Sequence, residues 1–142
     1  MTPEQIDLIE ESFDEIYPRR YDEVAALFYE RLFSLDPSLR SLFPEDMRDQ
    51  RRKLMMTFNI AVHGLRHPPS IVAALHELGR VHVVARVEPR HYDTVGQALL
   101  DTLRLVMGDL FTPEVETAWR AAYALIATTM LEGSSQVMAQ RA

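Results

Sequence analysis

The sequence contains no cysteine among its 142 residues. This absence excludes disulfides, thiolate zinc sites, iron–sulfur clusters, covalent cofactor attachment through Cys-x-x-Cys-His and a cysteine nucleophile. Any metal ion would therefore have to be bound by His, Met, Tyr, Asp or Glu side chains.

Long apolar runs and an excess of positive charge are also missing. No stretch approaches 18 uncharged apolar residues, and the N-terminal segment alternates apolar and acidic residues without the apolar core of a signal peptide. We therefore expect a cytoplasmic protein without membrane contact. The net charge of −6 argues against a nucleic-acid-binding surface, although residues 48–53 are locally basic.

Apolar residues recur at helical spacing along the chain, and no segment shows sustained strand-like alternation. Proline and glycine positions divide the chain into seven or eight helical segments, the first opening with a capping box from Thr2 to Gln5. The helices have unequal lengths and are joined by proline corners, which favours crossed packing over a parallel four-helix bundle. We predict a single all-α domain spanning residues 1–142.

Three helix ends are predicted from individual residues. Asp46 is a candidate N-cap for a long helix that carries Gln50, and Ser70 is a candidate N-cap for the helix that carries His82. The run Gly133-Ser134-Ser135 predicts the start of a fraying C-terminal tail.

The segment from Leu75 to His82 places a histidine on the apolar side of a helix. Within about 40°, one stripe of this helix carries Ile71, Leu75, Leu78 and His82. One explanation is a core histidine bonded to a backbone carbonyl. The other is a neutral imidazole that offers one nitrogen to a metal, such as the iron of a haem. The histidine alone does not decide between them.

Further motifs follow one another in a fixed order. They are Tyr29 within Leu27-Phe28-Tyr29, Pro37 six residues before Phe43, Gln50 seven residues after Phe43, Leu54 four further on, Leu78-Gly79-Arg80-x-His82, and Tyr92 ten residues after His82. In this order and spacing the chain resembles the globin family over nearly its whole length, specifically the bacterial single-domain globins and the haem domain of flavohaemoglobins.

The resemblance implies a globin fold of seven to eight helices around a buried, non-covalent haem b. It implies that His82 binds the iron, with other cofactor contacts from Phe43, Lys53, Leu54, Leu78 and Tyr92. On the opposite, distal side it implies that Tyr29, Gln50 and Leu54 face the bound ligand. The alternatives are core packing for Tyr29, Phe43, Leu54 and Tyr92, a solvent-facing helix start for Gln50, and an ordinary surface charge for Lys53.

The resemblance also implies a function and its partners. The first expectation is reversible oxygen binding at a five-coordinate ferrous iron, with O2, CO and NO as ligands, for storage or delivery. The alternative is nitric oxide dioxygenation with electrons from a separate reductase, because no reductase domain follows; a haem-based gas sensor is a third interpretation.

One position departs from the flavohaemoglobin pattern. In that family a glutamate on the last helix joins the iron-binding histidine and the tyrosine, and the matching position, eleven residues after Tyr123, is Ser134. Glu132 is close in sequence but about 200° away around a helix. We therefore expect an incomplete relay on this side.

Overall fold

The computed structural model describes residues 1–141, with side chains for residues 1–83 and 85–135. All regular structure in this part of the chain is helical, which confirms the all-α prediction. The elements are α1 (Pro3–Asp14), α2 (Tyr21–Leu35), the 3-10 helix η1 (Pro37–Leu42), α3 (Arg48–His63), α4 (Pro69–Val84), α5 (Pro89–Met107), the 3-10 helix η2 (Gly108–Leu110) and α6 (Pro113–Arg141).

Short sequence signals set several helix starts. The capping box of α1 forms as predicted: the Thr2 hydroxyl accepts the Gln5 N–H at 3.1 Å, and the Gln5 side chain accepts the Thr2 N–H at 3.0 Å. Before η1, the Asp36 carboxylate accepts the Ser38 N–H at 3.1 Å. Proline occupies the first position of α4, α5 and α6, where the missing N–H costs nothing.

The three predicted helix ends differ from those in the structure. Helix α4 begins at Pro69, so Ser70 is not its cap and instead donates to the His67 carbonyl at 2.7 Å. Met47 takes the cap position of α3, although the Asp46 carboxylate still accepts the Arg48 N–H at 3.0 Å. Helix α6 continues through 133–135 to Arg141, because burial against α4 outweighs the low helix propensity of glycine there.

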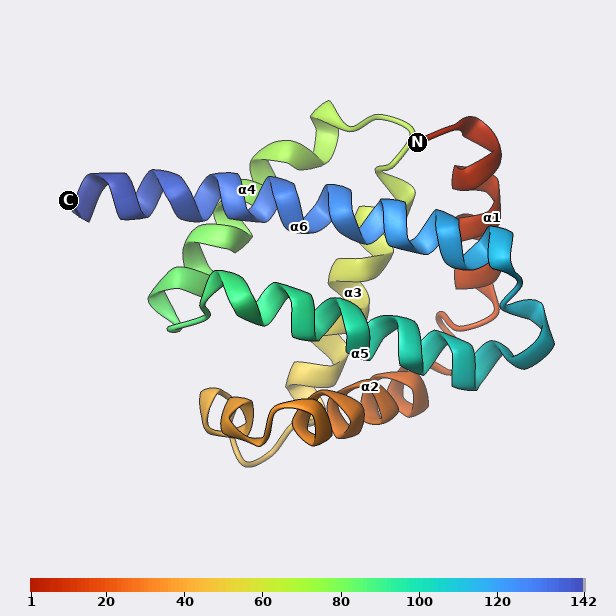
Figure 1. Ribbon diagram of the computed structural model, residues 1–142, viewed down its shortest axis with the longest axis horizontal. Coiled ribbons are helices and arrows are strands. Elements are labelled where there is room, and N and C mark those ends of the chain that lie inside the picture. The colour runs from red at the N-terminus through yellow and green to blue at the C-terminus, as the bar shows by residue number, and fades with distance from the viewer. Residues whose placement is uncertain (142) are drawn as a thin grey trace.

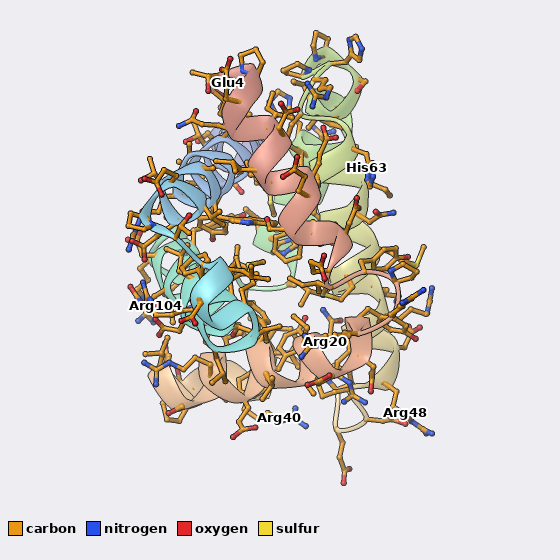
Figure 2. All side chains as sticks on the ribbon, turned by 90° about the vertical axis from the view of Figure 1, so that its right-hand side faces the viewer. Glu4, Arg20, Arg40, Arg48, His63 and Arg104 are labelled. Carbon is orange, nitrogen blue, oxygen red and sulfur yellow. The ribbon has the colours of Figure 1, made fainter. Side chains whose placement is uncertain are left out.

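The helices cross one another instead of lining up as a bundle. Helices α5 and α6 run beside each other, α3 crosses behind them, and α2 lies across the lower end of α3 (Figure 1). Helix α4 packs most extensively on α6. Charged side chains such as Glu4, Arg48 and Arg104 point outward (Figure 2). Within the described part of the chain, every helix is too short or too polar to cross a membrane.

Buried apolar side chains form two clusters. The larger one joins α1, α2, α3, α5 and the first half of α6 around Trp119, and it includes Tyr29 with Phe43 and Leu54 at its edge. The smaller cluster joins α4 to α6, to the end of α3 and to the start of α5. Its buried members are Ala61, Ile71, Leu75, Tyr92, Ile126 and Met130. Tyr29 and Leu54, on the proposed distal side, thus belong to one cluster, and Leu78 and Tyr92 belong to the other.

Candidate cofactor site

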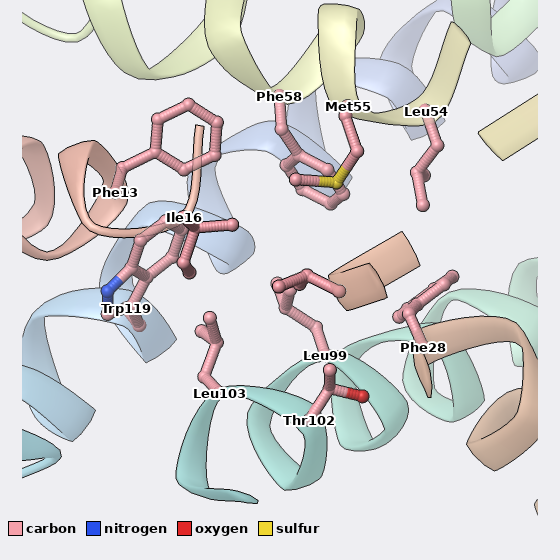
Figure 3. Close-up of a pocket in the computed structure, with 11 residues that line it drawn as sticks. Phe13, Ile16, Phe28, Leu54, Met55, Phe58, Leu99, Thr102, Leu103 and Trp119 are labelled. Carbon is pink, nitrogen blue, oxygen red and sulfur yellow. The ribbon is translucent and has the colours of Figure 1, made fainter. Parts of the chain in front are cut away.

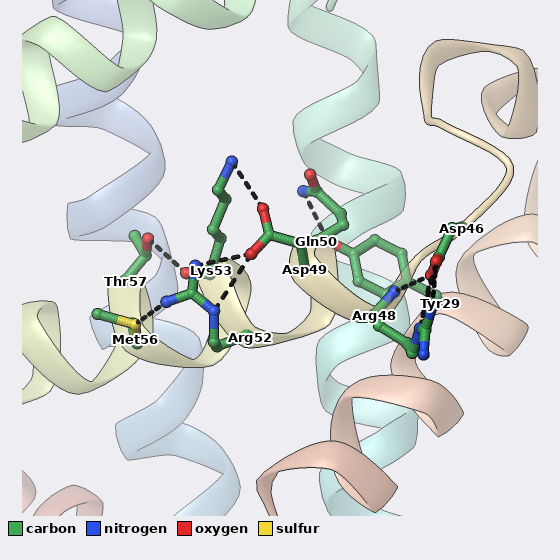
Figure 4. Close-up of polar contacts among 9 residues, drawn as sticks. All are labelled: Tyr29, Asp46, Arg48, Asp49, Gln50, Arg52, Lys53, Met56 and Thr57. Atoms are coloured by element: carbon green, nitrogen blue, oxygen red, sulfur yellow. Dashed lines mark hydrogen bonds and ion pairs between the residues drawn. The ribbon is translucent and has the colours of Figure 1, made fainter.

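A buried polar pair connects α2 and α3. The Tyr29 side chain is only 5% exposed, and the Gln50 Nε2 donates to the Tyr29 hydroxyl oxygen at 3.1 Å (Figure 4). Because the amide supplies the hydrogen, the phenol oxygen acts as the acceptor. Among the described residues the Tyr29 hydroxyl donates its hydrogen to no acceptor, so it can donate to a further group.

Aromatic rings surround the Tyr29 hydroxyphenyl group. The ring centroids of Phe28, Phe33 and Phe43 lie 5.1, 5.8 and 5.4 Å from that of Tyr29. Burial raises the pKa of Tyr29 to about 12, against a smaller opposing effect of the Gln50 hydrogen bond. The hydroxyl is therefore protonated at neutral pH and serves as a hydrogen-bond donor.

Leu54 follows Gln50 by one turn of α3 and lines a small apolar cavity (Figure 3). The wall includes Phe28, Leu103 and Trp119, contributed by α2, α5 and α6. Its polar member, Thr102, donates its hydroxyl to the Ala98 carbonyl at 2.7 Å. A cavity with such a lining suits a small apolar molecule better than water, which needs two or more polar partners.

On α4, the His82 ring is held in one tautomer. Its Nδ1 lies 2.7 Å from the Leu78 carbonyl oxygen, which can only accept, so Nδ1 carries the hydrogen and Nε2 has the free lone pair. Burial lowers the pKa of His82, and the carbonyl bond opposes that shift. A neutral imidazole with its Nδ1–H anchored is the form that binds a metal ion through Nε2. The backbone bond expected of a core histidine is thus compatible with metal binding.

Tyr92 lies beside His82, with 6.5 Å between the ring centroids. The Tyr92 hydroxyl oxygen is buried and makes no hydrogen bond within the described residues, while the Tyr123 hydroxyl donates to the Tyr92 backbone carbonyl at 2.5 Å. Leaving a buried hydroxyl without a partner costs about 1–3 kcal/mol. Native proteins tolerate this cost mainly where function or an additional bound group requires it.

The remaining sequence-predicted residues have other partners. Lys53 is exposed and forms an ion pair with Asp49 at 3.0 Å (Figure 4). Glu132 pairs with His76 at 3.0 Å and makes no hydrogen bond to the His82 ring within the described residues. The half-buried Leu78 side chain packs in the smaller cluster, and its carbonyl orients His82.

The sequence analysis missed the contact between α4 and α6 beside the histidine. Ser134 is buried and donates its hydroxyl to the Gly79 carbonyl at 3.0 Å. A Cβ on Gly79 would lie 1.9 Å from the Met130 carbonyl oxygen, so only glycine permits this approach. Glycine in a helix interior costs about 1 kcal/mol relative to alanine, and that unfavourable choice was the available signal of a close helix crossing.

The globin family model matches residues 26–130. Among curated relatives, a flavohemoprotein of Vibrio cholerae is 31% identical over 117 residues, covering 80% of this chain and 30% of the relative. A flavohemoprotein of Deinococcus radiodurans is 27% identical over 134 residues, covering 92% of this chain and 33% of the relative. The chain thus spans about a third of the length of these relatives.

Two solved structures share the whole arrangement of helices. A bacterial globin of Campylobacter jejuni superposes with a TM-score of 0.87 at 21% identity, covering 96% of this chain and 99% of that one. An engineered carbene transferase made from a proposed nitric oxide dioxygenase of Rhodothermus marinus has a TM-score of 0.87 at 26% identity, covering 98% of this chain and 96% of that one. The structural likeness shows the globin fold.

Proposed function

Because the chain belongs to the globin family, we propose that residues 1–142 form one globin domain that binds dioxygen reversibly. The cofactor is haem b, which globins hold without covalent attachment. When bound, haem would supply a ferrous iron that takes up diatomic gases. The described residues fit this group, because His82 presents a free Nε2 lone pair and Tyr92 has a buried hydroxyl without a partner.

On the proximal side, His82 is the iron ligand in this proposal. The Leu78 carbonyl holds the Nδ1–H at 2.7 Å, which keeps the tautomer with an available Nε2 and restricts rotation of the ring. Tyr92 packs beside the imidazole, and Leu78 contributes apolar surface. Among the described residues, no carboxylate forms a hydrogen bond with the His82 ring. The imidazole therefore acts as a neutral ligand in this proposal.

On the distal side, Tyr29 donates its hydroxyl to the ligand. The observation that carries the proposal is the 3.1 Å bond from Gln50 to Tyr29, because it makes the phenol an acceptor on one side and leaves its hydrogen for the ligand. The hydrogen bond that Tyr29 accepts from Gln50 also polarises the phenol, which strengthens the hydrogen bond that the phenol donates to the ligand. Phe43 and Leu54 limit the space and exclude water. Lys53 is exposed and paired with Asp49, and its contact with the cofactor stays a prediction.

Replacing His82 with alanine tests the cofactor assignment. Apoprotein titrated with hemin should show quenched emission from Trp119, the only tryptophan, and a Soret band after reduction typical of a five-coordinate histidine complex. The His82→Ala variant should bind hemin at least tenfold more weakly, since its main coordinate bond is lost. His76→Ala, which changes a histidine on the same helix that pairs with Glu132, is the matched control. Equal hemin affinity in wild type and His82→Ala contradicts the assignment.

Nitric oxide dioxygenation is the second candidate. It is supported by the relatives named flavohemoprotein and by the structural neighbour derived from a proposed nitric oxide dioxygenase. A donor such as Tyr29, which retains negatively polarised dioxygen, serves this reaction as well as reversible binding. Mixing oxygenated protein with one equivalent of nitric oxide should then give stoichiometric nitrate and ferric haem. Repeated turnover would require a source of electrons to return the iron to the ferrous form. Recovery of nitric oxide without nitrate contradicts this candidate.

A further inference from the structure

The contact between α4 and α6 places the iron-binding segment of α4 unusually close to the backbone of another helix. A Cβ on Gly79 would lie 1.9 Å from the Met130 carbonyl oxygen, and a Cβ on Gly133 would lie 2.1 Å from the His76 carbonyl oxygen. Each helix thus presents a glycine to a carbonyl of the other. This reciprocal arrangement holds the backbone of α4 directly against α6, without intervening side chains.

One side-chain hydrogen bond spans this contact beside His82. The Ser134 hydroxyl lies 3.0 Å from the Gly79 carbonyl oxygen and 3.3 Å from the Met130 carbonyl oxygen of its own helix. Ser134 is 4% exposed, so water does not compete for the bond. The adjacent carbonyl, that of Leu78, accepts the Nδ1–H of His82. Neighbouring peptide groups of one helical turn therefore bind the Ser134 hydroxyl and the histidine ring.

We propose that Ser134 is a positioning residue for His82. Its hydroxyl fixes the turn 78–82 of α4 on α6 through the Gly79 carbonyl, and this turn sets the depth and rotation of the His82 imidazole. The inference rests on the proposed function insofar as His82 is taken to bind iron. It assigns to Ser134 a mechanical role, in which a neutral hydroxyl holds the backbone that carries the ligand.

The described charged side chains near Ser134 have partners of their own and do not bind the Gly79 carbonyl. Glu132 bonds His76 at 3.0 Å, and Glu77 bonds the Arg80 guanidinium at 2.6 Å, so both carboxylates are engaged on the outer side of α4. The Ser134 side chain lies close enough to the Tyr92 hydroxyl to oppose the effect of burial, which raises the Tyr92 pKa, but the two hydroxyls do not meet the geometry of a hydrogen bond. The single hydrogen of Ser134 is directed to backbone carbonyls instead.

Three variants separate the hydrogen bond from packing. Ser134→Ala removes the hydroxyl, while Ser134→Cys keeps a side chain of similar size with a much weaker donor. Ser135→Ala changes the exposed neighbour on the same helix and is the matched control. If the hydrogen bond positions His82, the alanine and cysteine variants at 134 should behave alike, and the control should behave as wild type.

Amide hydrogen exchange of the haem-free protein is the first measurement. Amides of residues 80–83 should exchange about two- to tenfold faster in Ser134→Ala and Ser134→Cys, as expected for loss of one buried hydrogen bond. The second measurement is the iron–histidine stretching band in the resonance Raman spectrum of the ferrous haem protein. This band should shift or broaden in both variants at 134 and remain unchanged in Ser135→Ala.

The outcomes are distinguishable. Wild-type exchange and an unchanged band in Ser134→Ala would overturn the proposal. If Ser134→Ala changes the exchange rates and the band while Ser134→Cys behaves as wild type, the effect comes from packing and not from the hydrogen bond. That result would also overturn the proposal. Faster exchange without a change in the band would mean that Ser134 holds α4 but does not position His82. A wild-type protein that takes up no haem would refute the proposed function, while the exchange result would still decide whether Ser134 fixes the turn that carries His82.

Discussion

Removing the Tyr29 hydroxyl should separate the behaviour of dioxygen from that of carbon monoxide. The phenol is buried among aromatic rings and receives the Gln50 amide hydrogen at 3.1 Å, so its own hydrogen is directed to the ligand without competition from water. A hydrogen bond to a group that carries charge contributes about 1.5–3 kcal/mol. Dioxygen becomes partly negative on ferrous haem, whereas carbon monoxide stays nearly neutral. Tyr29→Phe should therefore speed dioxygen dissociation by about ten- to a hundredfold.

Stopped-flow replacement of each ligand measures both dissociation rates in wild type and variant. Carbon monoxide dissociation should change by less than about threefold, because Phe keeps the ring and its contacts with Phe33 and Phe43. Phe33→Leu is the matched packing control: it removes a ring stacked on Tyr29 without removing a donor, and it should affect both ligands by similar factors. If Tyr29→Phe changes both rates by the same factor, or changes neither, Tyr29 is a core residue and the distal mechanism is wrong.

Three further predictions concern Gln50, the pKa of Tyr29 and the contact between α4 and α6. Gln50→Leu should speed dioxygen dissociation less than Tyr29→Phe does, since the amide acts through the phenol; an equal or larger effect in the same stopped-flow assay would reverse the ranking. Because burial raises the pKa of Tyr29 to about 12, dioxygen dissociation should stay constant between about pH 6 and pH 9, and a rate that rises across this interval would contradict a protonated phenol donor. Gly133→Ala should lower the free energy of unfolding by about 1–3 kcal/mol, as measured by urea denaturation of the haem-free protein, because its Cβ would meet the His76 carbonyl; unchanged stability would mean that α4 and α6 can separate without cost.

The helical architecture could be predicted because its signals are local. The capping box at Thr2 and the proline corner at Pro37 depend on residues a few positions apart, and both form in the structure. Tyr29 and Gln50 were assigned to one side of the site from the order and spacing of the motifs, and they meet because α2 and α3 cross at that point. The spacing of the two residues could not predict that the Gln50 amide donates and the Tyr29 hydroxyl accepts.

The sequence analysis failed where tertiary contact overrides local preference. Gly133-Ser134-Ser135 has the composition of a fraying helix end, yet α6 continues because α4 covers it. The role of Ser134 could not be predicted, since it depends on a carbonyl 55 positions away in the chain. Serine is a favourable residue type for a helix cap, but Pro68 takes the cap position of α4 two residues before Ser70, and Pro69 is the first helical residue.

Reversible oxygenation of the purified ferrous protein tests the central claim most directly. Absorption spectra would be recorded while the gas above the sample alternates between argon and air over several cycles. The account predicts a Soret band that moves between two spectra through constant isosbestic points, with no gain of ferric haem over the first cycles. A protein without a Soret band, or one that converts completely to the ferric form on its first exposure to air, would contradict reversible dioxygen binding held by His82 and Tyr29.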